Sequence, residues 1–116
     1  MLDLTKKPYH LTKEQIQLLQ DKVKNMTLDE KIGQLFFVIG QDEEQVDITE
    51  FIKTYRPGGM MYRPAAAEKI KRQLATAQEA SDIPLFFSAN LESGGNGIIT
   101  EGTWFGMPMQ IAATND

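Results

Sequence analysis

Cysteine is absent from this 116-residue chain, and no long apolar run is present. The missing cysteines exclude disulfides and thiolate chemistry, and they fit a reducing compartment. No run approaches the roughly 20 apolar residues that a membrane span needs. The charged amino end also lacks the apolar core of a signal peptide. We therefore expect a soluble cytoplasmic chain with no membrane partner, of a length that suits one modest domain and not a complete α/β barrel.

Basic residues are missing from the last third of the chain, because all 12 lysines and arginines precede Gln73. The formal net charge is −4, and a phosphate-binding face in the last third would need basic side chains that are not there. We therefore predict no nucleic-acid partner. The single histidine, His10, lies in a predicted amino-terminal arm beside Pro8, where a surface position is expected and no triad or zinc site is available. The sequence predicts no metal and no cofactor.

Apolar periodicity predicts helices that alternate with short strands. Two capping boxes, Thr12 with Gln15 and Thr27 with Glu30, indicate helix starts, and Pro64 suits the first turn of another helix. The expected order is helix 13–24, a helix from residue 28, strand 35–40, helix 48–55, strand 60–62, helix 64–80 and strand 85–88. The aromatic and β-branched strand 35–40 is expected to be buried on both faces. The predicted fold class is therefore α/β, with about three parallel strands and covering helices, and no final strand or closing helix is evident in the last residues.

A polar, glycine-rich loop, residues 89–97 (ANLESGGNG), follows the last predicted strand. Loops at the carboxyl ends of parallel strands commonly carry ligand sites. We expect a small-molecule site centred on Asn90 and Glu92. In the alternative interpretation, Asn90 is a turn residue, Glu92 holds the loop by accepting backbone N–H bonds, and Glu101 is solvated. A catalytic carboxylate pair of Glu92 and Glu101 is the less favoured hypothesis, because no sequence rule brings them within the required distance.

Other functional patterns are weak in this chain. The loop lacks the G-x-G-x-x-G order of a dinucleotide fingerprint, and no lysine follows it as in a P-loop. The acidic run 42–47 lacks the ligand spacing of a calcium loop, so a solvated loop is expected. Trp104 and Phe105 would suit stacking on a sugar, but core packing is the preferred prediction.

Four blocks of the sequence together resemble glycoside hydrolase family 3. They occur in the order and approximate spacing of that family, and they are residues 26–35 (MTLDEKIGQL), 56–61 (RPGGMM), 90–95 (NLESGG) and 102–116 (GTWFGMPMQIAATND). The resemblance implies a (β/α)8 barrel of which this chain holds the first part. It also implies a retaining glycosidase that releases terminal β-linked sugars such as N-acetylglucosamine or glucose, with a lean toward β-N-acetylhexosaminidases.

The resemblance assigns no catalytic residue to this chain, because the family's nucleophile and acid/base lie beyond the matched blocks. Its sugar-binding aspartate corresponds to Asn90, which keeps an acceptor and gains a donor but loses the charge. A substrate-binding role is thus implied for Asn90 and, by the same loop, for Glu92. The arginine that often follows the two glycines is replaced by Asn96.

The expected domain division is an amino-terminal arm and helix over 1–25 and a partial barrel domain over 26–116. The chain alone is expected to be inactive. The alternative is a non-catalytic carbohydrate-binding or protein-interaction module built on a half-barrel. Open sheet edges and uncovered apolar faces also predict self-association or pairing with the rest of a barrel.

Overall fold

The computed structural model describes residues 3–40 and 46–114. The chain divides into two compact units, one ending at Ile32 and the other beginning at Gly33. The first unit contains α1 (Lys13–Asn25) and most of α2 (Leu28–Gly33). The second contains every strand, together with α3 (Ile48–Tyr55), α4 (Ala67–Ala80), the 3-10 turn η1 (Gly95–Gly97) and α5 (Pro108–Ala113). Among the described residues, no helix is both long enough and apolar enough to cross a bilayer.

Both predicted capping boxes of the first unit are present. At α1, the Gln15 amide donates to Thr12 Oγ1 over 3.2 Å, and the Thr12 amide donates to Gln15 Oε1 over 2.8 Å. At α2, Thr27 and Glu30 exchange the same two bonds at 3.2 and 2.6 Å. Each box satisfies amides at the start of its helix that no helical carbonyl can reach. The two helix starts were therefore predicted correctly.

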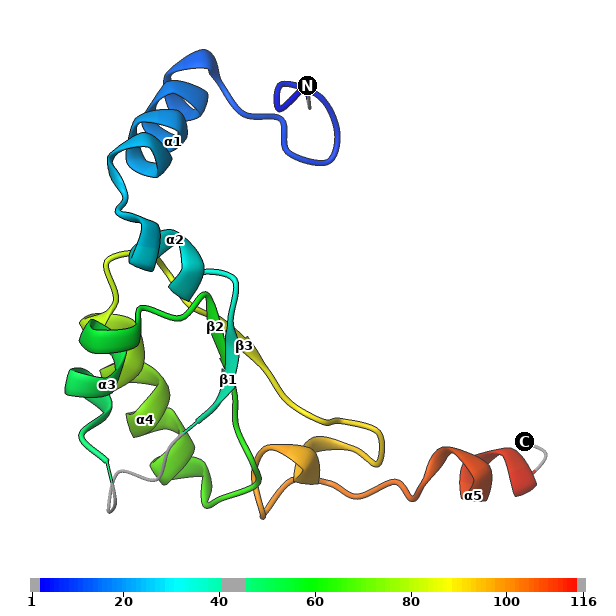
Figure 1. Ribbon diagram of the computed structural model, residues 1–116. Coiled ribbons are helices and arrows are strands. Elements are labelled where there is room, and N and C mark those ends of the chain that lie inside the picture. The colour runs from blue at the N-terminus through cyan, green and yellow to red at the C-terminus, as the bar shows by residue number, and fades with distance from the viewer. Residues whose placement is uncertain (1–2, 41–45, 115–116) are drawn as a thin grey trace. The chain divides into compact units, whose positions relative to one another are not determined.

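A three-stranded parallel sheet forms the centre of the second unit. Its strands are β1 (Phe37–Ile39), β2 (Gly59–Met61) and β3 (Phe86–Ser88), in the order β1-β2-β3. Helices α3 and α4, which connect successive strands, both lie on the same face of this sheet (Figure 1). The α/β class and the parallel order were predicted from the alternation of elements.

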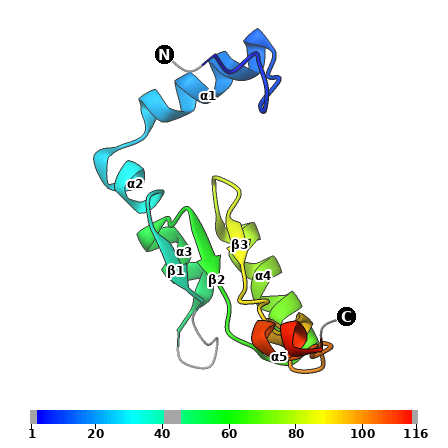
Figure 2. The ribbon, with the colours of Figure 1, turned by 90° about the vertical axis from the view of Figure 1, so that its right-hand side faces the viewer.

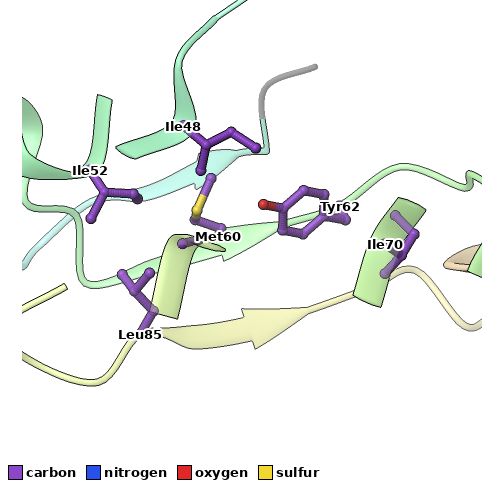
Figure 3. Packing of buried hydrophobic residues seen from close by; sticks show 7 residues of the cluster. Ile48, Ile52, Met60, Tyr62, Ile70 and Leu85 are labelled. Atoms are coloured by element: carbon purple, nitrogen blue, oxygen red, sulfur yellow. The ribbon is translucent and has the colours of Figure 1, made fainter. Parts of the chain in front are cut away.

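The core of the unit is the layer between this sheet face and the two helices. Met60 at the middle of β2 is completely buried, and the register places Val38 and Phe87 on either side of it. Figure 3 shows the side chains around Met60, including Ile48 and Ile52 of α3, Ile70 of α4, and Leu85 and Tyr62 beside the strands. The helical stripe of α3 predicted from sequence thus contributes Ile48 and Ile52 to this layer.

The opposite face of the sheet, which Figure 2 views, is exposed. Phe37, Ile39 and Phe86 are 53%, 45% and 75% exposed, so the prediction that residues 35–40 are buried on both faces was wrong. Successive strand side chains point to opposite faces, and α3 and α4 cover only one. The ring of Phe37 lies over Gly59, where a Cβ would overlap it.

Helices α4 and α5, in the carboxyl half, both differ from prediction. Helix α4 begins at Ala67, three residues after Pro64, because Ala65 pairs with a distant segment. The Ala65 amide donates to the Ile98 carbonyl over 3.2 Å, and the Ala65 carbonyl accepts from the Thr100 amide over 3.0 Å. Helix α5 was not predicted, although Pro108 at its first turn is a helix-start signal.

Candidate functional site

The loop that follows β3 carries both residues predicted to bind a ligand. Asn90 and Glu92 are exposed, and the loop leaves the sheet at the same end as the connection from β2 to α4 (Figure 1). Within residues 3–40 and 46–114, neither the Asn90 amide group nor the Glu92 carboxylate has a hydrogen-bond partner. Both groups can therefore bind a ligand without breaking an internal bond.

Glycines give the loop a compact backbone. Gly94 has φ +120°, a conformation that side chains rarely allow, and its amide donates to the Leu91 carbonyl over 3.1 Å. Gly97 packs directly on the backbone of Asn90, because a Cβ at Gly97 would overlap the Asn90 oxygen and lie 2.6 Å from the carbonyl carbon. The turn η1 thus supports the main chain of the candidate ligand residue.

Residues 103–105 close the loop from the other side. Trp104 forms an antiparallel bridge with Gly94, and the Phe105 amide donates to the Ser93 carbonyl over 2.7 Å. Trp104 and Phe105 are 62% and 70% exposed. The preferred prediction, core packing, is therefore wrong for both in the described chain.

Glu101 accepts a backbone N–H bond, a role that only the alternative interpretation of the sequence considered, and gave to Glu92. Its Oε2 accepts from the Ala67 amide over 3.2 Å and from Thr100 Oγ1 over 3.0 Å. Its own backbone N–H, the Thr100 hydroxyl and, more weakly, the Ala67 amide lower the pKa of the Glu101 carboxyl. Glu101 is exposed, as the alternative interpretation expected, but its carboxylate also accepts these two hydrogen bonds.

A signal for this contact was present in the sequence. The residue before α4 is Ala66, whose side chain cannot cap a helix, and no side-chain cap bond is made there. The first amides of the helix therefore need an acceptor from elsewhere in the chain. The run Ala65-Ala66-Ala67 identifies the need, but only the fold shows that Glu101 meets it.

The described residues offer no metal site. No group of three His, Cys, Asp or Glu side chains in residues 3–40 and 46–114 is arranged to hold an ion. Asp47, at the end of the acidic run 42–47, caps α3 by accepting from the Glu50 amide over 3.1 Å, and residues 42–45 of that run lie outside the described part. His10 is exposed in the amino-terminal arm.

The chemistry of the loop suits a neutral polar ligand. An amide side chain offers both a hydrogen-bond donor and an acceptor, and a carboxylate accepts hydrogen bonds from hydroxyl groups. No lysine or arginine occurs after Arg72 to attract an anion. The exposed indole of Trp104 adds an apolar surface to the same loop.

A family model for the glycosyl hydrolase family 3 N-terminal domain matches residues 27–116. The chain belongs to glycosyl hydrolase family 3. The three parallel strands and their helices correspond to the amino-terminal part of the family's barrel domain, as the four sequence blocks implied.

Individual relatives agree with this assignment. A β-N-acetylglucosaminidase/β-glucosidase of Cellulomonas fimi is 33% identical over 114 residues, which are 98% of this chain and 20% of that protein. The structure of the β-glucoside phosphorylase BglX bound to 2FGlc is 40% identical, with a TM-score of 0.79 over 97% of this chain and 21% of its own. A second BglX structure gives 39% identity and a TM-score of 0.74. The family 3 chain thus spans about a fifth of the length of these relatives.

Proposed function

We propose that this family 3 chain supplies part of the sugar-binding surface of a glycosidase, with Asn90 and Glu92 as hydrogen-bonding partners of a terminal β-linked sugar. The observation that carries the proposal is that both side chains are exposed and unbonded in the described chain, on a loop whose backbone is held by internal bonds. Membership in a family of glycosidases supports carbohydrate as the ligand class. The names of the relatives favour N-acetylglucosamine or glucose.

Catalysis belongs, in this proposal, to residues outside the matched blocks. A retaining glycosidase needs a nucleophile and an acid/base about 5–5.5 Å apart, and neither role falls on Asn90 or on Glu101, which is bonded to α4. The chain alone is therefore inactive. Residues 26–116 act as the barrel part and residues 1–25 as an arm and helix, in a cytoplasmic protein without cofactor.

Sugar binding is tested by titrating the isotopically labelled chain with N-acetylglucosamine and with glucose. The side-chain amide resonance of Asn90 should shift with one of them, and Asn90→Ala or Glu92→Ala should weaken the binding. Glu79→Ala removes an exposed carboxylate from the end of α4 and is the matched control. If neither sugar moves the Asn90 resonance at millimolar concentration, the proposed site is wrong.

Inactivity is tested with aryl β-glucosides and aryl β-N-acetylglucosaminides. Each is offered in water and with inorganic phosphate, because one relative is named a glucosidase and another a phosphorylase. We expect no turnover under either condition. Reproducible turnover that disappears in Glu92→Gln would instead favour the less favoured catalytic pair.

The second candidate function is a non-catalytic binding or interaction module. The neutral Asn90 at the position of the family's aspartate favours it, because an amide binds hydroxyls less strongly than a carboxylate. Asn90→Asp separates the two functions. If Asn90→Asp binds sugar more strongly than the natural chain, the result fits the glycosidase site. If the natural chain binds sugar tightly and Asn90→Asp does not, the result fits the non-catalytic module.

Self-association is part of the same proposal. The apolar sheet face of Phe37, Ile39 and Phe86 is exposed, and β1 and β3 each pair with a strand on only one side in the described sheet. Such faces and edges favour pairing with another chain. Sedimentation at increasing concentration should show dimers or larger species, and a monomer at every concentration would contradict this.

A further inference from the structure

Three bonds join the loop after β3 to the amino end of α4. Two are backbone bonds between Ala65 and the segment Ile98–Thr100, which form a parallel bridge. The third joins the Glu101 carboxylate to the Ala67 amide. Of the three, only the third depends on a side chain, so a mutation can remove it without altering the backbone pairing. Ile98 and Ile99 also pack against the core, which keeps this segment close to α4.

A chain of close backbone contacts leads from Glu101 to Asn90. Gly102, the next residue, lies against η1, where a Cβ at Gly102 would overlap the Gly95 carbonyl and lie 2.5 Å from the Asn96 amide nitrogen. At the other end of η1, Gly97 lies against the carbonyl of Asn90. Because neither contact contains a side chain that can turn away, a displacement of residues 101–102 displaces η1 and then Asn90.

We propose that Glu101 is a positioning residue, whose carboxylate holds the loop on the amino end of α4 and thereby sets the position of Asn90. That this positioning affects sugar binding rests on the proposed function, whereas the effect of Glu101 on the position of Asn90 does not. A carboxylate at this place also interacts favourably with the partial positive charge of the first helical amides, and a neutral acceptor interacts with it more weakly. The acceptor is needed because Ala66 provides no capping group.

The test compares Glu101→Ala, Glu101→Gln and Glu68→Gln in the labelled chain. Glu68 is an exposed carboxylate in the first turn of the same helix, so its variant removes a charge near the helix end and leaves the Glu101 bond in place. In Glu101→Ala, hydrogen exchange at the Ala67 amide should accelerate by about two- to fivefold, and the Asn90 backbone and side-chain resonances should shift. Glu101→Gln should restore part of the Asn90 shift, and Glu68→Gln should leave Asn90 unchanged.

Sugar affinity is the second measurement. It should fall by about two- to fivefold in Glu101→Ala, in proportion to the lost helix-end interaction, while the helical circular dichroism stays unchanged. If Ala67 exchange accelerates but the Asn90 resonances do not move, the positioning role is refuted. If the Asn90 resonances move and the natural chain binds no sugar, positioning stands and the proposed function fails. If the natural chain binds sugar and Glu101→Ala binds it equally well, the positioning of Asn90 has no part in recognition.

Discussion

Two glycines of η1, two residues apart, should respond oppositely to the same substitution. A Cβ at Gly97 would overlap the Asn90 oxygen and lie 3.3 Å from the Leu91 Cα, so Gly97→Ala forces the backbone of the loop after β3 to move. A Cβ at Gly95 would meet nothing closer than 3.6 Å, which is ordinary contact. Neither glycine has a positive φ. The difference between the variants therefore reports the close approach to Asn90 and no difference in backbone conformation.

The magnitude follows from two opposing effects. Replacing glycine by alanine at a compatible site stabilises a protein by about 0.4–1 kcal/mol, because the unfolded chain loses freedom. Forcing an extra carbon into packed atoms costs about 1–3 kcal/mol. We expect Gly95→Ala to be neutral or slightly stabilising. The gain from the unfolded chain is common to both variants, so Gly97→Ala should be less stable than Gly95→Ala by the packing cost alone, about 1–3 kcal/mol.

The assay is urea unfolding of the natural chain and both variants, followed by circular dichroism, together with the Asn90 resonances of the labelled proteins. Gly97→Ala should lower the unfolding midpoint with an unchanged slope, shift the Asn90 resonances and weaken sugar binding. Gly95→Ala should leave the Asn90 resonances in place. Equal stabilities with unmoved Asn90 resonances in Gly97→Ala would refute the argument, because the loop would then have room that the structure does not contain.

Three further predictions concern the core, the acid response and the open sheet face. Ile52 is only 1% exposed, so Ile52→Ala should lower the free energy of unfolding by about 2–5 kcal/mol. Leu18 is 69% exposed, so Leu18→Ala should change that free energy by less than about 0.5 kcal/mol. Equal losses of stability in urea unfolding would contradict the assigned core. The folded chain lowers the pKa of Glu101, chiefly through the backbone N–H of Glu101 itself. The ionised carboxylate therefore stabilises the fold fully above the pKa of the unfolded chain, about 4.3. This stabilisation is lost as pH falls through the lower pKa of the folded chain. The stability difference between the natural chain and Glu101→Gln should therefore shrink below about pH 4.3. A constant difference down to about pH 2 would count against stabilisation of the ionised carboxylate by its hydrogen bonds. Phe86→Asp should shift sedimentation toward the monomer, while Tyr55→Asp on α3, also exposed, should not; no change with Phe86→Asp would exclude the sheet face as the contact.

Local patterns predicted the elements of this fold well. The capping boxes at Thr12 and Thr27 and the apolar stripe of α3 depend on residues three or four positions apart, so the sequence is sufficient to locate them. The loop with Asn90 and Glu92 was also located from sequence, because a polar glycine-rich segment followed a predicted strand. The family was identified from the resemblance of four ordered motif blocks within residues 26–116, and the family model confirms it over residues 27–116.

Contacts between distant residues were beyond such patterns. The late start of α4 depends on the pairing of Ala65 with Ile98 and Thr100, more than 30 positions later. The bond from the Ala67 amide to Glu101 has the same cause, since nothing near Glu92 or Glu101 in sequence shows which of the two lies beside that amide. Likewise, the apolar composition of 35–40 cannot show that only one face of β1 is covered.

The sequence by itself determined the order of helices and strands as far as β3, the parallel sheet and the family. The first two follow from short-range periodicity and capping, and the family follows from ordered motif blocks. The tertiary structure alone decided that Glu101 caps α4, that Gly97 supports the main chain of Asn90, and which side chains of the sheet stay exposed. Those features depend on the distance in space between residues far apart in the chain. Such distances are set by the packing of the whole unit, and no local pattern encodes them.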